Sequence, residues 1–91
     1  MKFVWDDKKE KDNINIHGID FSTAALVFGD SSRLEYFDES HSMDEDRYIT
    51  IGSIDGLITV LFVVYTERKD SIRIISARCA TKQERNEYYG R

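Results

Sequence analysis

The feature that most constrains the fold is a long β-prone segment, residues 47–67, which reads RYITIGSI, then DG, then LITVLFVVYTE. β-Branched and aromatic residues fill both sides of Asp55-Gly56, a dipeptide favoured in two-residue hairpin turns. Such a turn pairs Ile54 with Leu57 and thereby fixes the register of every later pair. The segment therefore predicts an antiparallel hairpin.

In this register the hairpin is apolar on both faces. We expect one face to carry Ile49, Ile51, Val60 and Phe62. We expect the other face to carry Tyr48, Thr50, Leu61 and Val63. A strand that is apolar on both faces belongs in the middle of a sheet, because both faces must be covered.

The residues before the hairpin predict a short strand at 3–5 and two helices. Asp6 can cap a first helix that runs to about residue 17, where Gly18 fits the position after its end. This helix is mostly polar and is expected to bury a thin stripe that includes Ile14. Asp20 can cap a second helix at 21–29. Its apolar face would hold Phe21, Ala24, Ala25 and Phe28.

Residues 33–37 predict another strand, and the polar, acidic stretch 38–46 predicts a loop. Residues 68–70 are expected to turn the chain into a last strand at 71–78, whose register the sequence does not fix. Thr81 to Glu84 forms a capping-box pattern, which predicts a helix to about Tyr89. The order β-α-α-β-β-β-β-α predicts one α+β domain over residues 1–91. We expect an antiparallel sheet of four to five strands, two N-terminal helices and one C-terminal helix.

Composition narrows the class of protein. The longest apolar run, residues 58–65, has the length of a strand and not of a membrane span. The N-terminus becomes acidic at Asp6 before a signal-peptide core could form. Cys79 is the only cysteine, so neither an internal disulfide nor a cysteine-based zinc cluster can form. These features predict a cytoplasmic protein that does not associate with a membrane.

Charge is unevenly distributed along the chain. The formal charge is −7 for residues 1–66 and +3 for residues 67–91, which gives −4 for the whole. A basic C-terminal quarter on an acidic body offers one surface to an anion such as nucleic acid. A solvated surface without a ligand explains the same pattern.

Several kinds of site leave no trace in the sequence. It contains no glycine-rich phosphate loop, no HExxH motif and no CxxC pair. His17 and His41 lie far apart without a local set of metal ligands. We therefore expect neither a metal nor a cofactor.

The remaining candidates for chemistry are arginines in the last hairpin. Arg68, Arg73 and Arg78 fall within eleven residues, and Glu67 precedes them. The planar guanidinium binds phosphate with two parallel hydrogen bonds and keeps its charge. Such groups can stabilise the charge that develops when an RNA 2′-hydroxyl attacks the adjacent phosphodiester, a reaction that requires no metal. Alternatively, each arginine forms an ion pair with an acidic residue.

His41 is the candidate acid or base of the acidic loop, since imidazole exchanges protons near neutral pH. A solvent-exposed histidine without a catalytic role is the alternative. His17 is expected at the C-terminal end of the first helix, where a histidine that is bonded locally is the alternative to a catalytic one. Trp5, Tyr36 and Tyr48 have aromatic rings that could stack on bases or pack in the core.

Three segments resemble the signature blocks of the BrnT family of toxins. They are VWDDKKEKDNINIHGIDFSTA, DESHSMDEDRYITIG and VVYTERKDSIRIISARCATKQERNEYY, and the resemblance extends from about Phe3 to Tyr89. The matching positions in the first block are Trp5, Asp6, Lys9, Asn13, His17 and Gly18. In the second block they are His41, Ser42, Glu45 and Arg47. In the third they are Glu67, Arg68, Arg73, Ser76, Arg78, Ala80, Glu84 and Arg85.

The resemblance implies a RelE-like fold and a metal-independent ribonuclease that inhibits translation. It implies a partner, a BrnA-type antitoxin that binds operator DNA, so that the toxin meets that DNA only indirectly. It also implies a dimeric or heterotetrameric complex. On this basis we expect catalytic roles for Arg68, Arg73, Arg78, Glu67 and His41. We expect RNA binding by Lys9, His17, Arg47, Lys82 and Arg85, and we expect Arg73 and Arg78 to hold the scissile phosphate.

Two other functions fit the same residues. A non-enzymatic module could use its basic hairpin and last helix to bind an acidic antitoxin segment, or act as a co-repressor. A structural or stress protein could use the arginines in salt bridges only.

Overall fold

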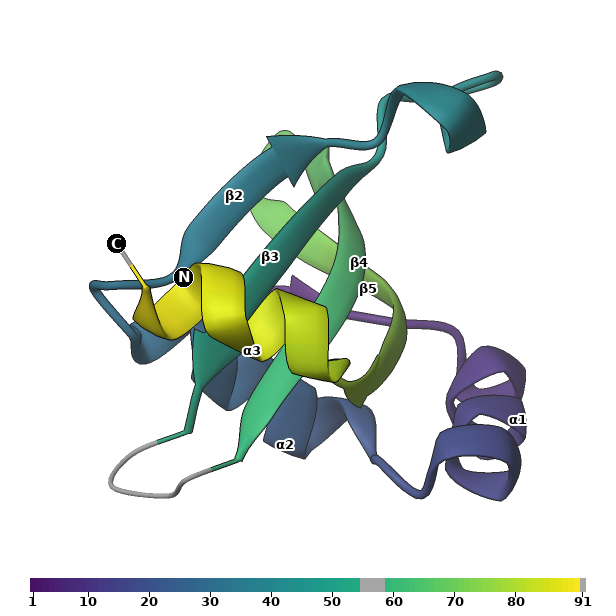
Figure 1. The fold of residues 1–91 in the computed structure, drawn as a ribbon. Helices are drawn as coiled ribbons and strands as arrows, with labels where there is room; N and C mark the ends of the chain where they lie inside the picture. Colours follow the sequence, from purple (N-terminus) through teal and green to yellow (C-terminus); the bar gives the residue numbers. More distant parts are fainter. Residues whose placement is uncertain (55–58, 91) are drawn as a thin grey trace.

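The computed structural model describes residues 1–54 and 59–90, which form one five-stranded sheet with helices on both faces (Figure 1). The strands are β1 (Phe3–Val4), β2 (Leu34–Phe37), β3 (Tyr48–Ser53), β4 (Val60–Arg68) and β5 (Ser71–Cys79). Their spatial order is β1-β5-β4-β3-β2, so the doubly apolar strand β4 lies at the centre as its pattern requires. The predicted α+β class and order of elements are confirmed.

The sheet is mixed, and the expectation of a purely antiparallel sheet is wrong at one edge. β1 pairs with β5 in parallel, matching Phe3 with Ile72 and Val4 with Arg73. The other neighbouring strands are antiparallel. Parallel neighbours need a long connection, and the chain from β1 to β5 passes through every other strand and two helices. A pattern of local turns therefore does not reveal this pair.

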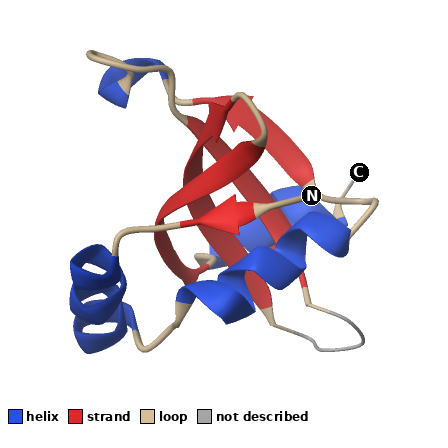
Figure 2. Ribbon diagram, turned by 180° about the vertical axis from the view of Figure 1, so that it is seen from behind, coloured by secondary structure: helices blue, strands red, loops and turns tan. Residues whose placement is uncertain are grey.

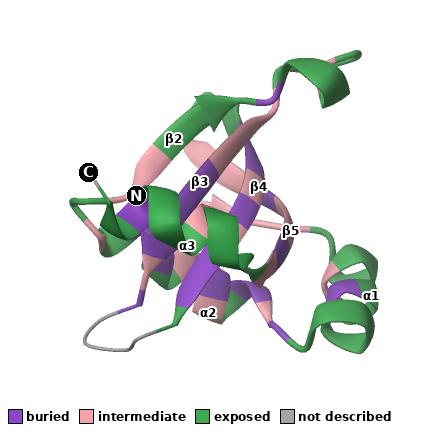
Figure 3. Ribbon diagram, in the orientation of Figure 1, coloured by how far each residue is buried: buried purple, intermediate pink, exposed green. Residues whose placement is uncertain are grey.

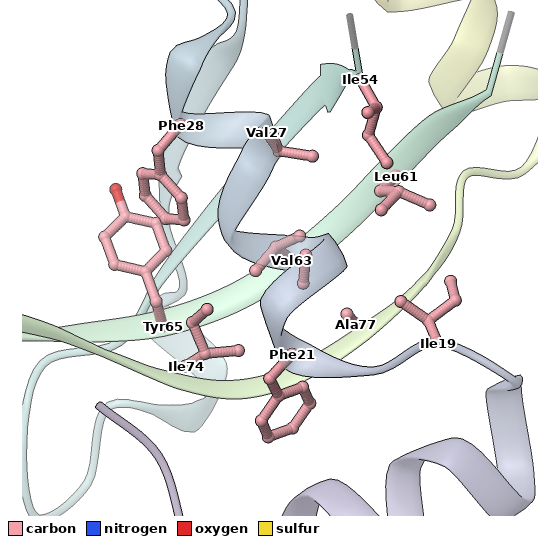
Figure 4. Close-up of a cluster of buried hydrophobic side chains, with 11 residues drawn as sticks. Ile19, Phe21, Val27, Phe28, Ile54, Leu61, Val63, Tyr65, Ile74 and Ala77 are labelled. Atoms are coloured by element: carbon pink, nitrogen blue, oxygen red, sulfur yellow. The ribbon is translucent and has the colours of Figure 1, made fainter. Parts of the chain in front are cut away.

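The register of the β3–β4 hairpin differs by two residues from the expected one. Ile51 pairs with Phe62, and Ser53 with Val60. Ile54 lies beyond the last pair and packs into the core with Leu61 (Figure 4). A shift of two keeps every side chain on its face, so the two predicted apolar faces are confirmed. The predicted Asp55-Gly56 turn lies outside the described residues.

The first helix, α1 (Asp7–His17), has the predicted boundaries. The Asp6 carboxylate accepts a hydrogen bond from the Lys9 amide at its start, and Gly18 ends it in a left-handed conformation with φ 73°. The expected apolar stripe is wrong, because Ile14 is 43% exposed and the buried residue is Asn13. Polar contacts, and not an apolar face, therefore attach this helix.

The predicted second helix is two elements, α2 (Phe21–Ala25) and the 3₁₀ helix η1 (Leu26–Gly29). Asp20 caps α2 as expected. The larger core cluster lies between these helices and the sheet (Figure 4). Phe21 and Val27 are completely buried there, and the Phe28 ring packs on Tyr65 at 4.9 Å between ring centroids.

The last helix, α3 (Lys82–Tyr89), covers part of the opposite face of the sheet, as the views from the two sides show (Figures 1 and 2). Thr81 and Glu84 form the predicted capping box. Tyr88 packs with Ile51 and Val60 in a second, smaller core cluster. None of the helices in the described residues is long and apolar enough to span a membrane.

Candidate functional site

A groove of about 530 Å³ lies on the α3 side of the sheet, between the sheet and the loop that joins β2 to β3. The floor is largely apolar and comes from β3, β4 and β5, and the polar groups come mainly from the loop and from the far end of β5. Its lining residues are Asp38, Ser40, His41, Arg47, Ile49, Phe62, Val64, Ile75, Ser76 and Arg78. α3 crosses the other half of this face, and the loop, which contains the short 3₁₀ helix η2 (Glu39–His41), projects at the top of the view (Figure 3).

Arg78 forms one wall of the groove. Its guanidinium lies over the Phe62 ring, 3.8 Å from the ring centroid, and donates to both carboxylate oxygens of Glu84 at 2.7 and 3.0 Å. Hydrogen bonding to Glu84 outweighs burial and raises the pKa of Arg78, and the same bonds lower the pKa of the Glu84 carboxyl. Two nitrogens of the Arg78 guanidinium are therefore engaged by Glu84, so only part of the group is free to contact the scissile phosphate that it was expected to hold.

His41 stands at the rim of the groove, where Asp38 holds it. The His41 Nδ1 atom lies 3.1 and 3.0 Å from the two carboxylate oxygens of Asp38. The Asp38 side chain is 10% exposed and that of His41 is 68% exposed. Sequence reasoning missed Asp38. The signal that could have found it is an aspartate three residues before a histidine, at the end of a strand.

Arg47 reaches the groove from the other end of the same loop. Its backbone carbonyl accepts from the Asp38 amide at 2.8 Å, and its amide donates to Ser42 Oγ at 2.9 Å. These bonds hold both ends of the loop together. In the part of the chain that the structure describes, the Arg47 side chain makes no hydrogen bond or ion pair.

Arg68 and Arg73 line a second hollow, of about 300 Å³, near the end of β1. Trp5 lies beside them, with its ring edge-on to Phe21. Arg68 is paired with Glu45 of the loop at 3.3 Å. The Arg73 side chain has no hydrogen bond or ion pair to any described residue. β5 pairs Arg73 with Thr66 and Arg78 with Phe62, which places both arginines on the α3 side of the sheet.

The three predicted arginines therefore do not surround one point. Arg78 joins His41 and Arg47 in the groove, whereas Arg68 and Arg73 share the smaller hollow. The groove opens on the α3 side of the sheet, and the smaller hollow lies at its β1 edge.

Glu67 is not part of either group, because it pairs with Ile72 and faces the side that carries the larger core. It borders a different cavity, of about 380 Å³, with Glu35 and Tyr65. Burial, together with the charges of Glu35 and Glu67, raises the pKa of Tyr65 to about 12.

The other predicted RNA-binding residues lie on helices outside both hollows. Lys9 and His17 are exposed on α1. Lys82 and Arg85 lie on α3, where Arg85 donates to the Ala80 carbonyl at 3.0 Å. The structure thus places His41, Arg47 and Arg78 around one groove. It places the other four residues, Lys9, His17, Lys82 and Arg85, outside it. Across residues 1–54 and 59–90, no three His, Cys, Asp or Glu side chains are grouped so that they could hold a metal ion.

Comparison with known proteins identifies the family. A family model described as "Ribonuclease toxin, BrnT, of type II toxin-antitoxin system" matches residues 5–84, which is most of the chain. No curated protein matches the chain. The match includes every residue that lines the groove, Glu84 and, apart from Val4, the residues that line the smaller hollow.

Proposed function

The chain belongs to the BrnT family of ribonuclease toxins of type II toxin–antitoxin systems, and we propose that its groove cleaves RNA by transesterification. The 2′-oxygen of a ribose attacks the adjacent phosphorus, and the bond from phosphorus to O5′ breaks. The 2′-hydroxyl loses one proton and O5′ gains one, so no co-reactant is needed. The products are a 2′,3′-cyclic phosphate and a 5′-hydroxyl.

The observation that carries this proposal is the meeting of His41, Arg47 and Arg78 around one groove, from a loop and a strand distant in sequence. We assign His41 to proton transfer, because imidazole can act as acid or base near neutral pH. The two guanidinium groups would stabilise the negative charge that develops on the phosphoryl oxygens. The apolar floor would accept a base.

Arg73 and Arg68 would bind the RNA backbone beyond the scissile bond, next to Trp5. Arg73 is the better candidate of the two, because its guanidinium forms no hydrogen bond or ion pair with any described residue. Guanidinium is suited to phosphate at both places, since it donates in a plane and stays protonated. The role first expected for Arg73, at the scissile phosphate itself, thus becomes a role at a neighbouring phosphate.

We extend the proposal to the biology that the family implies. The chain would act in the cytoplasm, without a metal ion, and inhibit translation by cutting messenger RNA. A BrnA-type antitoxin that represses the shared operon would neutralise it in a dimeric or heterotetrameric complex, and the fold would be related to that of RelE. The cationic and imidazole groups of the groove supply charge stabilisation and proton transfer, which is what supports a reaction without metal.

The direct test has two parts. Induced expression of the chain alone should stop growth and degrade messenger RNA, and the purified chain should cut a synthetic RNA oligonucleotide. The new ends should be a 2′,3′-cyclic phosphate and a 5′-hydroxyl. His41→Ala and Arg47→Ala should abolish or strongly slow the cut, whereas Asp46→Asn, in the same loop, should not. An intact oligonucleotide under all conditions would refute the proposed chemistry.

A second function has its own support. Arg68 and Arg78 are already paired with Glu45 and Glu84, as in a module that uses its arginines for structure. Such a module would bind the antitoxin or act as a co-repressor without cutting RNA. Normal growth on induction, with intact RNA but tight antitoxin binding, would favour it.

Antitoxin binding can be located by hydrogen exchange. If the antitoxin inhibits by covering the groove, complex formation should block cleavage and protect β4 and β5 from exchange. Protection confined to residues 6–28 would mean that inhibition does not occur by direct occlusion.

A further inference from the structure

Asp38 contacts the His41 ring from a fixed position in the fold. It follows directly after the last residue of β2, and its carboxylate is nine-tenths buried. Both of its oxygens approach Nδ1 of His41, at 3.1 and 3.0 Å. The Ser40 hydroxyl donates to one of these oxygens at 3.1 Å. A buried carboxylate in the groove wall therefore faces one defined nitrogen of an exposed ring.

The backbone around Asp38 is held in place by a closed set of hydrogen bonds. The Asp38 amide donates to the Arg47 carbonyl at 2.8 Å. Ser42 Oγ donates to the Asp38 carbonyl at 2.6 Å and accepts from the Arg47 amide at 2.9 Å. The 3₁₀ helix η2 then returns the chain so that His41 lies above Asp38, with its amide donating to the Asp38 carbonyl at 3.3 Å. The carboxylate is thereby attached to the ends of β2 and β3.

The chemistry of the contact favours one position for the ring proton. An ionised carboxylate only accepts hydrogen bonds, so in the neutral ring it favours the tautomer with the proton on Nδ1. Ser40 Oγ also lies 3.1 Å from Nδ1, and a hydroxyl that gives its single proton to Asp38 can only accept from Nδ1–H. In the neutral ring the lone pair is then on Nε2, on the side away from Asp38.

We propose that Asp38 is a positioning residue that holds the neutral His41 ring in the Nδ1–H tautomer, so that Nε2 is the nitrogen that exchanges protons with RNA. This inference rests on the proposed function, because it assigns a role within the same groove. Without Asp38, the ring is free to turn and to place its proton on Nε2, where it cannot accept the 2′-hydroxyl proton. Orientation of a histidine by a carboxylate has this effect in other enzymes that transfer protons.

The alternative is that the pair only closes the loop. A purely structural contact predicts that the protein loses stability without Asp38, but it predicts no loss of turnover in the fraction that stays folded. The value of kcat measured on the folded variant therefore distinguishes the two roles, and the ring nitrogens test whether Asp38 sets the tautomer at all.

The test is nitrogen-15 NMR of the histidine rings in the full chain, at a pH where they are neutral, together with RNA cleavage. The unmodified chain should show His41 as the Nδ1–H tautomer. His17, the second histidine, provides an internal reference, since its side chain has no hydrogen bond to a described residue. Asp38→Asn should move His41 toward the Nε2–H tautomer and leave His17 unchanged. It should also lower kcat by about 10²- to 10⁴-fold with little change in KM. Asp46→Asn should alter neither readout.

The outcomes separate this proposal from the proposed function. An Nε2–H tautomer at His41 in the unmodified chain overturns the positioning role, even if RNA is cut normally. Full cleavage by His41→Ala overturns it as well. If Asp38→Asn fails to fold, an Nε2–H tautomer in the unmodified chain still overturns the proposal. If the chain cuts no RNA, the proposed function fails, whatever the tautomer.

Discussion

Arg78 and Glu84 are joined by two parallel hydrogen bonds, and the same Glu84 carboxylate accepts the Thr81 amide at 2.8 Å to cap α3. One carboxylate therefore connects the wall of the groove with the start of the helix. Arg78 also donates to the Cys79 carbonyl at 3.2 Å. Its Nε has no partner among the described residues, so part of the guanidinium fork remains available to a phosphate.

Arg78→Ala should therefore reduce both stability and cleavage. The substitution leaves the partly buried Glu84 without its charged partner, which we expect to cost about 1–2 kcal/mol of unfolding free energy. Arg78→Lys should restore some of each, because lysine keeps the charge but not the fork. Urea unfolding and RNA cleavage of the purified variants measure the two effects. An unchanged unfolding midpoint for Arg78→Ala would show that the pair contributes nothing to stability.

Arg73→Ala should separate activity from stability. Because the Arg73 side chain is not engaged by any described residue, its loss should change the unfolding free energy by no more than roughly 1 kcal/mol. If it binds the RNA backbone, cleavage should fall by about 10²- to 10³-fold. Lys11→Ala on α1 removes the same charge from another surface and is the matched control. Full toxicity of Arg73→Ala on induction would argue against a phosphate-binding role.

Cleavage should persist after removal of divalent metal ions. The proposed reaction uses the imidazole of His41 and the cationic groups of the groove, and these do not depend on a metal ion. The measurement is the rate of oligonucleotide cleavage in EDTA, before and after magnesium is restored. A rate that falls in EDTA and recovers with magnesium would overturn the metal-independent mechanism.

Acid should destabilise the fold through Asp30 and Glu84. Hydrogen bonds from Arg78 lower the pKa of Glu84 from its ordinary 4.5. For Asp30, burial raises the pKa, but hydrogen bonds from Tyr88, Ser53 and Ser32 prevail and leave it below its ordinary 3.8.

Each of these carboxyls binds its proton less readily in the folded chain than in the unfolded chain. The stability that they contribute is therefore present above about pH 4.5 and is lost as the pH falls through the lower folded values. Glu84→Gln should flatten this part of the curve of unfolding free energy against pH. If the unfolding free energy of Glu84→Gln falls with pH as steeply as that of the unmodified chain, then Glu84 does not contribute to the loss of stability in acid.

Asn13 should contribute more to stability than its apolar neighbour Ile14. The buried Asn13 amide donates to the Ile19 and Ala77 carbonyls, each at 2.9 Å, and accepts from the Ala77 amide at 3.1 Å. Asn13→Ala leaves these backbone groups without partners, at a cost of about 2–4 kcal/mol. Ile14→Ala should change the unfolding free energy by only about 0.5 kcal/mol. Equal effects in urea unfolding would refute this assignment.

The sequence by itself determined the elements whose signals are local. Asp6, Asp20 and the Thr81–Glu84 capping box mark helix starts, because each cap satisfies backbone groups within one turn. The alternation of apolar residues in 47–67 determined the two faces of the central hairpin, since side chains on a strand have a period of two. The family blocks selected four residues that line the groove, His41, Arg47, Ser76 and Arg78, but not Asp38.

Only the tertiary structure decided what depends on contacts between distant residues. The parallel β1–β5 pair, the burial of Asn13 against Ala77 and the pairing of Arg68 with Glu45 each join segments far apart in the chain. Arg78 and His41 line one groove because the sheet brings β5 and the β2–β3 loop to the same face. A propensity or a periodicity describes neighbours along the chain, whereas the groove depends on which strands lie side by side in the sheet. The order of the strands follows from the need to cover both faces of β4.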